Sequence, residues 1–437
     1  NMEIATVFFN NSIDLYLKEN GIIAFVMPRS IITGAMQHNQ FREFRKPEIK
    51  LTQILDFENV KPLFNVPSCS IVCKNSEETS YPVPISKFEG DLKSKNLSLN
   101  KALKHIVVKE GTYSPPILKG KPSAYYDKLK MGARLAPRPF WFIEFIVHPI
   151  LRINPKVPKI GTTKKSRKQA KGNWKKVNLQ GVVDSQYIYA TLLSKDLLPF
   201  GYTKIRPVFV PTQPTKNSFN LLSISDLNRV GSTNSSNWLN NVEKLWKQYR
   251  SKKSEKNFPS VLDRINYQNL LSIQNPSKRF ILLYVASGTY IISTVIDRKK
   301  ISDFKVDQIS IKPTEFIVES KTWFLESNDK DEVHYLCAIL NSKLLSKNVN
   351  KLQTRGLWGV RDIHRRPFLF NIPLFKKDNV NHLRLAEISK GTHNMVSKIK
   401  KTGKSKGISA KRRRIQKVFF KEFKEIDTLV KNLLNIH

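Results

Sequence analysis

A cluster of arginines lies between residues 353 and 368, where the sequence reads QTRGLWGVRDIHRRPF. Its glycines would let the backbone approach phosphate groups, and arginine can donate two hydrogen bonds to a guanine edge or bind the sugar-phosphate backbone. The residues here that we expect to contact DNA are Gln353, Arg355, Trp358, Arg361, His364, Arg365 and Arg366. The alternative is an exposed loop that Trp358 anchors and in which Asp362 pairs with an arginine.

Three further basic segments favour the same kind of partner. In GARLAPRPFWF, Arg134 and Arg138 stand near Trp141, a similar but weaker pattern. Residues 156–176 are basic and polar, which predicts a mobile loop or arm. A basic run near the C-terminus would follow phosphates without regard to base sequence, giving steep salt dependence. The residues of that run are Lys411, Arg412 and Arg413. The alternative for the run is that it only keeps the chain in solution.

Two catalytic patterns also occur, and we favour neither. Glu319 and Lys321, with an aspartate upstream, match the Asp…Glu-x-Lys arrangement in which two carboxylates and a lysine support a magnesium-dependent nuclease. Matches this short are common by chance. His364 near Asp362 suggests a base with a carboxylate that orients it, but no serine or cysteine stands in a turn motif typical of a nucleophile. We therefore expect no catalytic residue and no metal site in this chain.

The whole chain is strongly basic. Its 437 residues include 75 lysines and arginines against 35 aspartates and glutamates, a formal net charge of +40. Self-repulsion of this size indicates a polyanionic partner, and duplex DNA is the partner we expect. A hydrophobic content of 40% is ordinary for folded domains and excludes a disordered basic tail. RNA is an alternative, because charge and exposed aromatic rings serve single strands equally well.

Other classes of protein are disfavoured by the sequence. No apolar run approaches the roughly 18 residues of a membrane-spanning helix, so we expect no membrane contact and a cytoplasmic location. The three cysteines cannot all pair with one another. Cys69 and Cys73 lie four apart in a strand-like run, which argues against a disulfide or a zinc site.

The first 75 residues predict an incomplete α/β unit. Residues 3–18 carry apolar side chains at helical spacing, and residues 22–27 form a continuous apolar run typical of a strand buried on both faces of a parallel sheet. A second helix is predicted over 33–45. Strands over 49–57 and 68–73 are too close for a helical crossover and should pair antiparallel. The strand at 22–27 then keeps an unpaired apolar edge, which a segment outside this unit must cover.

The remaining chain predicts three parts. Residues 76–110 are polar and lack helical periodicity, which predicts a linker. Residues 111–395 predict a mixed α+β domain, with short strands, a hairpin over 280–297 and a helix over 332–347. Residues 396–437 predict a basic helical tail.

Several segments carry a resemblance to a known family through their order and spacing. They are GIIAFVMPRSIITG, ILDFENVKPLFNVPSCSIVCK, NPSKRFILLYVASGT, FLESNDKDEVHYLCAILNS and QTRGLWGVRDIHRRPF. Together they resemble the C-terminal part of adenine-N6 DNA methyltransferases of the restriction-modification type. These enzymes fuse a Rossmann-like catalytic domain to a target-recognition domain. The resemblance covers most of residues 1–395.

The resemblance implies a fold and a domain order. The fold would be α/β, with a partial Rossmann-like methyltransferase unit over residues 1–75 and a linker over 76–110. A mixed α+β target-recognition domain would follow over 111–395, and the basic helical tail over 396–437. Residues 1–75 would correspond to the elements that follow the family's catalytic tetrapeptide.

Two motifs of the family do not occur in this sequence. One is the glycine-rich turn that holds S-adenosylmethionine, and the other is the Asn/Asp-Pro-Pro-aromatic tetrapeptide that bonds the target amino group. We therefore expect S-adenosylmethionine to serve the complete enzyme but not to bind this chain alone. The resemblance implies that a missing N-terminal catalytic half, in the same or a separate chain, completes a methyltransferase. The alternative is a non-catalytic DNA specificity subunit that docks on a separate catalytic chain.

The resemblance also gives Phe64 a role. In similar enzymes an aromatic residue in the loop corresponding to Val60–Pro67 stacks on the adenine that is flipped out of the duplex. A flipped base needs a π-face to replace the neighbours it has lost. The alternative is that Phe64 closes the end of the sheet as a core residue.

Overall fold

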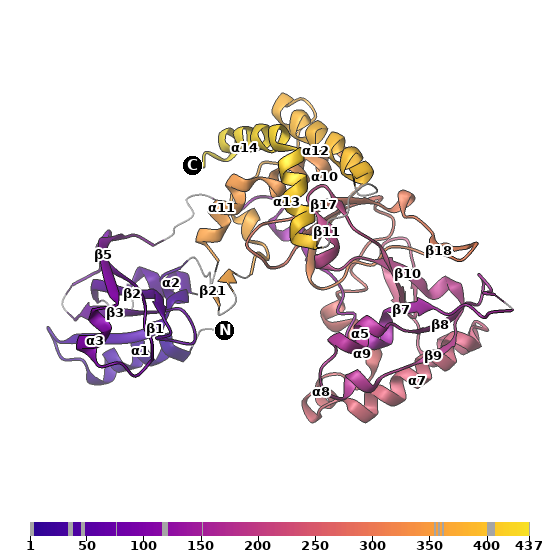
Figure 1. Cartoon of the computed structure of the whole chain (residues 1–437), viewed down its shortest axis with the longest axis horizontal. Helices are drawn as coiled ribbons and strands as arrows, with labels where there is room; N and C mark the ends of the chain where they lie inside the picture. Colours follow the sequence, from indigo (N-terminus) through magenta and orange to yellow (C-terminus); the bar gives the residue numbers. More distant parts are fainter. Residues whose placement is uncertain are drawn as a thin grey trace. The chain divides into compact units, whose positions relative to one another are not determined.

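The computed structural model describes residues 4–33, 38–44, 49–75, 77–115, 121–150, 152–353, 355–356, 359–360, 362–399 and 407–436. Of residues 355, 356, 359 and 360 it describes the backbone alone. The chain divides into two compact units (Figure 1). The first comprises Asn1–Pro122, Ser287–Tyr290 and Ser346–Asn371, and the second comprises Ser123–Ala286, Ile291–Leu345 and Ile372–His437.

A five-stranded sheet forms the centre of the first unit. Its strand order is β1-β3-β2-β4-β5, and among these strands only β2 and β4 pair parallel. The elements are α1 (Ile4–Tyr16), β1 (Ile22–Pro28), α2 (Asn39–Glu43), β2 (Lys50–Lys61), β3 (Ser68–Lys74), β4 (Val83–Asp91), α3 (Leu99–Leu103) and β5 (Ile106–Tyr113). The predicted antiparallel pairing of the strands at 49–57 and 68–73 is confirmed by β2 and β3.

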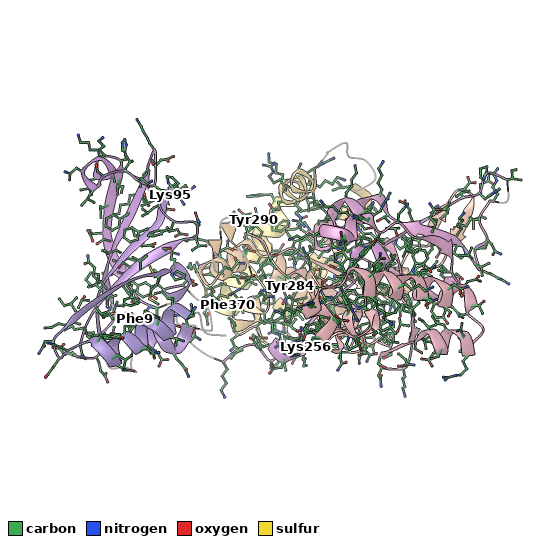
Figure 2. All side chains as sticks on the ribbon, turned by 90° about the horizontal axis from the view of Figure 1, so that it is seen from below. Phe9, Lys95, Lys256, Tyr284, Tyr290 and Phe370 are labelled. Atoms are coloured by element: carbon green, nitrogen blue, oxygen red, sulfur yellow. The ribbon has the colours of Figure 1, made fainter. Side chains whose placement is uncertain are left out.

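Helix α1 covers one face of this sheet. Phe9 and Ile13 are its buried apolar side chains, and they share one hydrophobic cluster with Ile23 and Met27 of β1. The Phe9 ring meets the Phe25 ring edge-on, with centroids 5.4 Å apart. Figure 2 shows Phe9 between the helix and the sheet. The helical spacing in the sequence thus produces one buried stripe, as expected for an amphipathic helix.

The structure corrects the prediction that residues 22–27 form a strand buried on both faces. β1 is an edge strand that pairs antiparallel with β3, and its burial alternates. Ile23 is buried, whereas Ile22 and Val26 are 70% and 58% exposed. The run is apolar on both faces, but only one face has elements packed against it.

The predicted second helix over 33–45 is also wrong in extent. Within the described part of that range, the helix α2 covers only Asn39–Glu43. It ends at Phe44, whose φ of 49° is left-handed, while Ile31 and Ile32 belong to a short turn of helix that ends before this range. Phe44 is buried in the core. Its packing there favours a backbone conformation that ends the helix, although the sequence pattern predicts that the helix continues.

The predicted linker over 76–110 is contradicted by two strands. β4 pairs parallel with β2 and antiparallel with β5, so this segment completes the sheet of the first unit. The segment consists mainly of β4, the short helix α3 and the first part of β5, so it has no long helical pattern. β5 is the far edge strand and is mostly exposed on both faces.

The second unit contains many short elements before its main sheet. They are β6 (Lys130–Met131), α4 (Arg138–Trp141), β7 (Ile143–Phe145), β8 (Lys159–Thr162), α5 (Lys164–Gln169), β9 (Gln180–Val182), β10 (Ile188–Thr191), β11 (Leu197–Leu198), β12 (Gly201–Tyr202), β13 (Arg206–Phe209), β14 (Thr212–Pro214), β15 (Phe219–Leu221), α6 (Ile224–Arg229), α7 (Thr233–Tyr249), α8 (Lys252–Asn257) and α9 (Val261–Ile265). Their common core includes Trp141 and Phe209, and Trp238, Val242 and Trp246 of α7 join it at four-residue spacing. That spacing places the three side chains on one helical face.

A four-stranded sheet and the C-terminal helices form the rest of the second unit. The sheet order is β17-β16-β20-β6, and every residue of β16 is buried, including Tyr284 (Figure 2). The elements are β16 (Phe280–Val285), β17 (Ser293–Asp297), β18 (Phe304–Val306), β19 (Ile309–Ile311), β20 (Thr322–Ser327), α10 (Lys330–Asn341), α12 (Val380–Ile399), α13 (Ile408–Val418) and α14 (Phe420–Leu434). α10 packs on β16 and β17, and α12 and α14 pack on α10 (Figure 1). The hairpin predicted over 280–297 is confirmed by the antiparallel pairing of β16 and β17.

The helix predicted over 332–347 is two helices. α10 ends at Asn341, and α11 (Lys343–Lys351) begins after Ser342. The ψ of Ser342 is 130°, which is extended rather than helical. Its hydroxyl donates to Asp427 Oδ1 at 2.7 Å and accepts from the Leu345 amide at 3.1 Å. A contact with a distant helix therefore stabilises the break.

The fold class predicted from the sequence is confirmed as a mixed α/β architecture with several sheets and a C-terminal helical segment. That segment is packed into the second unit, since α14 contacts both α10 and α12. No described helix is long and apolar enough to cross a membrane.

Candidate nucleic-acid interface

Phe64 lies in the turn between β2 and β3 and is 42% exposed. Its ring centroid is 6.2 Å from that of Phe57, which is 5.0 Å from that of Phe88 on the neighbouring strand. The same turn is held by Lys95, whose ammonium donates to Asn65 Oδ1 at 2.7 Å (Figure 2). Phe64 is thus the exposed end of a row of three rings. This exposure does not fit the alternative in which Phe64 is a core residue.

The predicted arginine cluster belongs to the first unit, and the structure describes it only in part. Gln353 is 2% exposed, and its amide nitrogen donates to the Gly288 carbonyl at 3.2 Å. Arg355 lies on β21 (Arg355–Gly356), which pairs with β22 (Gly359–Val360). Trp358 and Arg361 lie outside the described residues. Gln353 is therefore placed as a buried structural amide.

The C-terminal half of this cluster is a tight turn. His364 and Asp362 have left-handed φ values of 41° and 61°, and His364 Nε2 lies 3.3 Å from Asp362 Oδ1. Arg365 and Arg366 are half-buried at the start of a short 3-10 helix, Arg366–Leu369. Both side chains of the His364–Asp362 pair are nearly half exposed, so this turn presents a polar face to solvent.

Arg138 contacts a buried carboxylate. Its guanidinium donates to Glu319 Oε1 at 3.0 Å, and Glu319 is 3% exposed. The other carboxylate oxygen accepts from the Lys321 amide at 3.1 Å. An unpaired charge buried at this depth would be strongly unfavourable, so Arg138 stabilises the fold here. Among the described residues, no three His, Cys, Asp or Glu side chains lie close enough together to hold a metal ion.

Arg134 lines a cleft of about 710 Å³ in the second unit. Its guanidinium lies over the Tyr267 ring, 4.4 Å from the centroid. On the same cleft, the guanidinium of Arg264 lies 4.8 Å from the centroid of the Phe258 ring. The two rings meet edge-on at 5.5 Å. Sequence reasoning did not identify Arg264, Tyr267 or Phe258, although an arginine and an aromatic residue three apart beside amide residues, in DRINYQN, was a usable signal.

Arg264 also lines a second cleft of about 460 Å³, which brings more basic groups to the same side of this unit. Lys171 and Lys321 line that cleft together with Trp174. The Trp174 ring stacks on Trp246 with centroids 5.6 Å apart and planes 17° apart. The surrounding exposed lysines on α5 and the short helix Gly172–Lys176 are Lys164, Lys165, Lys168, Lys171, Lys175 and Lys176.

This lysine segment was predicted as a mobile loop or arm over 156–176, which is wrong. The segment forms β8 and α5, and Ile160 of β8 is fully buried. The Thr163 hydroxyl caps α5 by accepting from the Ser166 amide at 3.2 Å. The lysines are thus presented by ordered elements, and a rigid array loses less conformational entropy on binding a polyanion.

The basic run near the C-terminus lies on α13 and divides into exposed and inward-facing residues. Arg413 is exposed and Lys411 is half-buried. Arg412 donates to the Leu197 carbonyl at 2.9 Å and the Ser194 carbonyl at 3.1 Å. Burial lowers its pKa. Arg412 therefore ties the tail to the β11 segment and does not extend toward solvent as a phosphate ligand would.

Comparison with known proteins gives matches to solved structures only. No family model and no curated protein matches the chain. The chain matches, over 100% of its length and 50% of that chain, the type IIL restriction-modification enzyme MmeI solved in complex with DNA, with a TM-score of 0.55 and 10% identity. The type IIG restriction endonuclease BpuSI matches over 99% of this chain and 50% of its own, at 12% identity and a TM-score of 0.29. A nuclease-deletion mutant of the type ISP restriction-modification enzyme LlaGI, solved with a DNA substrate mimic, matches over 90% of this chain and 39% of its own. The identity is 12% and the TM-score is 0.34.

The match to MmeI shows that this chain shares a fold with part of that restriction-modification enzyme. The chain spans about half the length of the MmeI chain that it matches. The likeness covers both units of the present chain, so the N-terminal sheet and the larger second unit occur together in a restriction-modification protein.

Proposed function

We propose that this chain is the DNA-recognition part of a site-specific adenine-N6 DNA methyltransferase of the restriction-modification type. The observation that carries the proposal is the match of its whole length to half of MmeI, an enzyme solved in complex with DNA. The net charge of +40 and the ordered lysines around Trp174 supply the electrostatic attraction that such a part needs.

The catalytic half would cover apolar surfaces of α1 and β1 in the first unit. Apolar side chains are exposed on the outer side of α1 and on the face of the edge strand β1 that points away from α1, and an exposed edge of this kind invites pairing with another segment. They are Ile4, Phe8, Leu15, Tyr16, Ile22 and Val26. The occupant we propose carries the glycine-rich turn and the Asn-Pro-Pro-aromatic motif, because neither occurs in this sequence and the chain matches only 50% of MmeI. It belongs to the same polypeptide or to a separate catalytic chain on which this one acts as specificity subunit.

Each part would then have its own task. The catalytic half binds S-adenosylmethionine, the methyl donor. This chain would offer the exposed Phe64 ring as a stacking surface for an adenine that has left the duplex, and it would hold the DNA through its basic residues. Sequence readout would come from the second unit.

Competition binding tests the proposal directly. The full chain is titrated into labelled duplex DNA, duplex RNA and single-stranded RNA of equal length at one fixed salt concentration, and the affinities are compared by fluorescence anisotropy. We expect duplex DNA to bind tightest, with log affinity falling steeply as log salt rises. Equal or tighter binding of either RNA would overturn the proposal in favour of a general RNA-binding protein.

A further inference from the structure

The cleft that contains Arg134 and Arg264 holds two guanidinium groups without a carboxylate partner in the described structure. No described acidic group lies within ion-pair distance of either arginine, and both rest on aromatic rings. Asp263, the one acidic residue in the described lining, accepts instead from the Ser260 amide at 2.8 Å and the Ser260 hydroxyl at 2.9 Å. Burial lowers the pKa of Arg264, and the charge of Arg134 lowers it further. Two like charges are thus held close with no counter-charge from the protein.

The rim of the same cleft is rich in amide side chains. Asn257 and Gln268 are exposed, and neither side-chain amide makes a hydrogen bond to a described residue. Gln268 and Asn269 have consecutive left-handed φ values of 54° and 59°. Left-handed backbone is uncommon in residues other than glycine, and such strain is concentrated at functional sites.

A third amide side chain in this loop, that of Asn266, has a structural role, unlike those of Gln268 and Asn257. Asn266 Oδ1 accepts from the Leu271 amide at 3.2 Å and from the Ser272 amide at 3.1 Å. These bonds fix the loop that turns Gln268 and Asn269 outward. The loop is therefore built to present two amides rather than to bury them.

We infer that this cleft reads the edges of base pairs, with Arg134 and Arg264 as specificity-determining residues and Gln268 and Asn257 as polar partners at the rim. The inference rests on the proposed function. Arginine binds guanine O6 and N7 through two N–H groups, and glutamine or asparagine binds adenine N6 and N7. Bidentate binding of guanine requires a planar guanidinium held in a fixed orientation, which the stacking of Arg134 on Tyr267 and of Arg264 on Phe258 supplies.

A phosphate clamp is the competing use of two arginines. A phosphate group needs only donors, whereas Gln268 and Asn257 also offer acceptors, and base edges carry both kinds of group. The mixed donor and acceptor character of the rim therefore favours bases. This difference also separates the two uses experimentally.

The test selects DNA from a randomised duplex pool with the full chain and with single variants. Arg134→Lys and Arg264→Lys keep the charge but remove the bidentate fork. Gln268→Ala and Asn257→Ala change exposed rim residues, so folding does not depend on them. Arg229→Lys is the matched control, because Arg229 is an exposed arginine of the same unit whose partner is Asp226, at 3.2 Å. Circular dichroism during heating verifies that each variant folds.

We expect the wild-type chain to enrich a sequence motif and each cleft variant to relax it at one or two positions, with discrimination there falling about 10- to 100-fold. Affinity for unrelated duplex DNA and its salt dependence should stay unchanged. An unchanged motif in all four cleft variants would overturn the inference while leaving DNA binding intact. A uniform loss of affinity with a smaller salt slope would assign the arginines to phosphates and overturn it as well. If the wild-type chain enriches no motif, the proposed function fails, and this inference fails with it.

Discussion

Phe64 presents its ring to solvent at the end of the row formed with Phe57 and Phe88. If it stacks on a flipped adenine, Phe64→Ala removes a contact worth about 1–3 kcal/mol per base. We expect the assembled enzyme to lose about 10- to 100-fold in methyl transfer rate, while affinity for duplex DNA hardly changes. Initial rates and fluorescence anisotropy measure the two quantities.

Val66→Ala is the control for Phe64. Val66 lies in the same turn and is 48% exposed, but it offers no π-face. This variant should keep the wild-type rate. An equal loss in both variants would mean that the turn, and not the ring of Phe64, matters for catalysis.

Arg412 and Arg413 are neighbours on α13 with different predicted effects. Arg412→Ala removes the guanidinium that donates to the Leu197 and Ser194 carbonyls, so the free energy of unfolding should fall by about 1–3 kcal/mol. Arg413 is exposed, so Arg413→Ala should keep the stability and lower the slope of log affinity against log salt by about one. Urea unfolding and salt titrations of DNA binding measure these effects, and the reverse assignment would contradict the structure.

His393 gives the second unit a pH-dependent stability. Burial lowers its pKa to about 4, and the neighbouring His334 ring lies 4.8 Å away. The Val295 amide donates to His393 Nε2 at 3.0 Å, so the ring is held neutral. Because the pKa is lower in the folded state, the full stability is present above about pH 6.5, the ordinary pKa of histidine. It is lost as the pH falls from there toward 4.

The expected loss through His393 is about 3 kcal/mol at pH 4, from a shift of roughly 2.5 pKa units. Urea unfolding at several pH values measures it. His393→Gln should reduce the pH dependence between 6.5 and 4, whereas His148→Gln, at an exposed position of the same unit, should keep it. If both variants retained the wild-type pH dependence, another group would be responsible.

The sequence predicts the kind of side chain that can bind DNA but not which of these side chains are free to do so. Arg138 is engaged by Glu319, 181 positions away, and Arg412 by carbonyls more than 200 positions away. Arg134 and Arg264 have no such partners among the residues that the structure describes. Pairings between distant residues depend on the tertiary fold, and local patterns in a single sequence carry no information about them.

Secondary structure could be predicted where the local order of apolar and turn residues was enough to determine it. β2, β3 and the hairpin of β16 and β17 are apolar runs between turn residues, and the structure confirms their pairing. β4 and β5 were missed because charged residues, proline and glycine interrupt their apolar residues, so neither forms an apolar run. The break at Ser342 was missed because Asp427 on another helix stabilises it.

The β1 edge leads to a prediction about association. Val26 is 58% exposed on the edge strand β1, on the same exposed face as Ile22, so the isolated chain should self-associate as its concentration rises. Val26→Lys should reduce this association, because a charged edge disfavours strand pairing. Light scattering over a concentration series measures it. Val107→Lys is the control, since Val107 is 62% exposed on β5, the opposite edge strand, and should leave the association unchanged.

Across the whole molecule, the basic groups that we propose to read and hold DNA and the apolar surfaces that we propose to bind a catalytic partner lie in different units. The ordered lysines and the Arg134–Arg264 cleft lie in the second unit, whereas Phe64 and the apolar β1 edge lie in the first. This division suits an enzyme in which one unit recognises a sequence and the other completes the catalytic domain. It also means that DNA binding and methyl transfer should be separable.

If DNA binding and methyl transfer are separable, this chain should bind DNA without modifying it. The chain alone, mixed with duplex DNA and labelled S-adenosylmethionine, should transfer no methyl group, because its sequence contains neither the glycine-rich turn nor the Asn-Pro-Pro-aromatic motif. Adding the polypeptide encoded immediately upstream should produce N6-methyladenine. Val26→Lys should abolish this complementation while keeping DNA affinity, and Val107→Lys should not. Methyl transfer by the chain alone would contradict the division of tasks, since it would place the donor site and the reacting groups within these 437 residues.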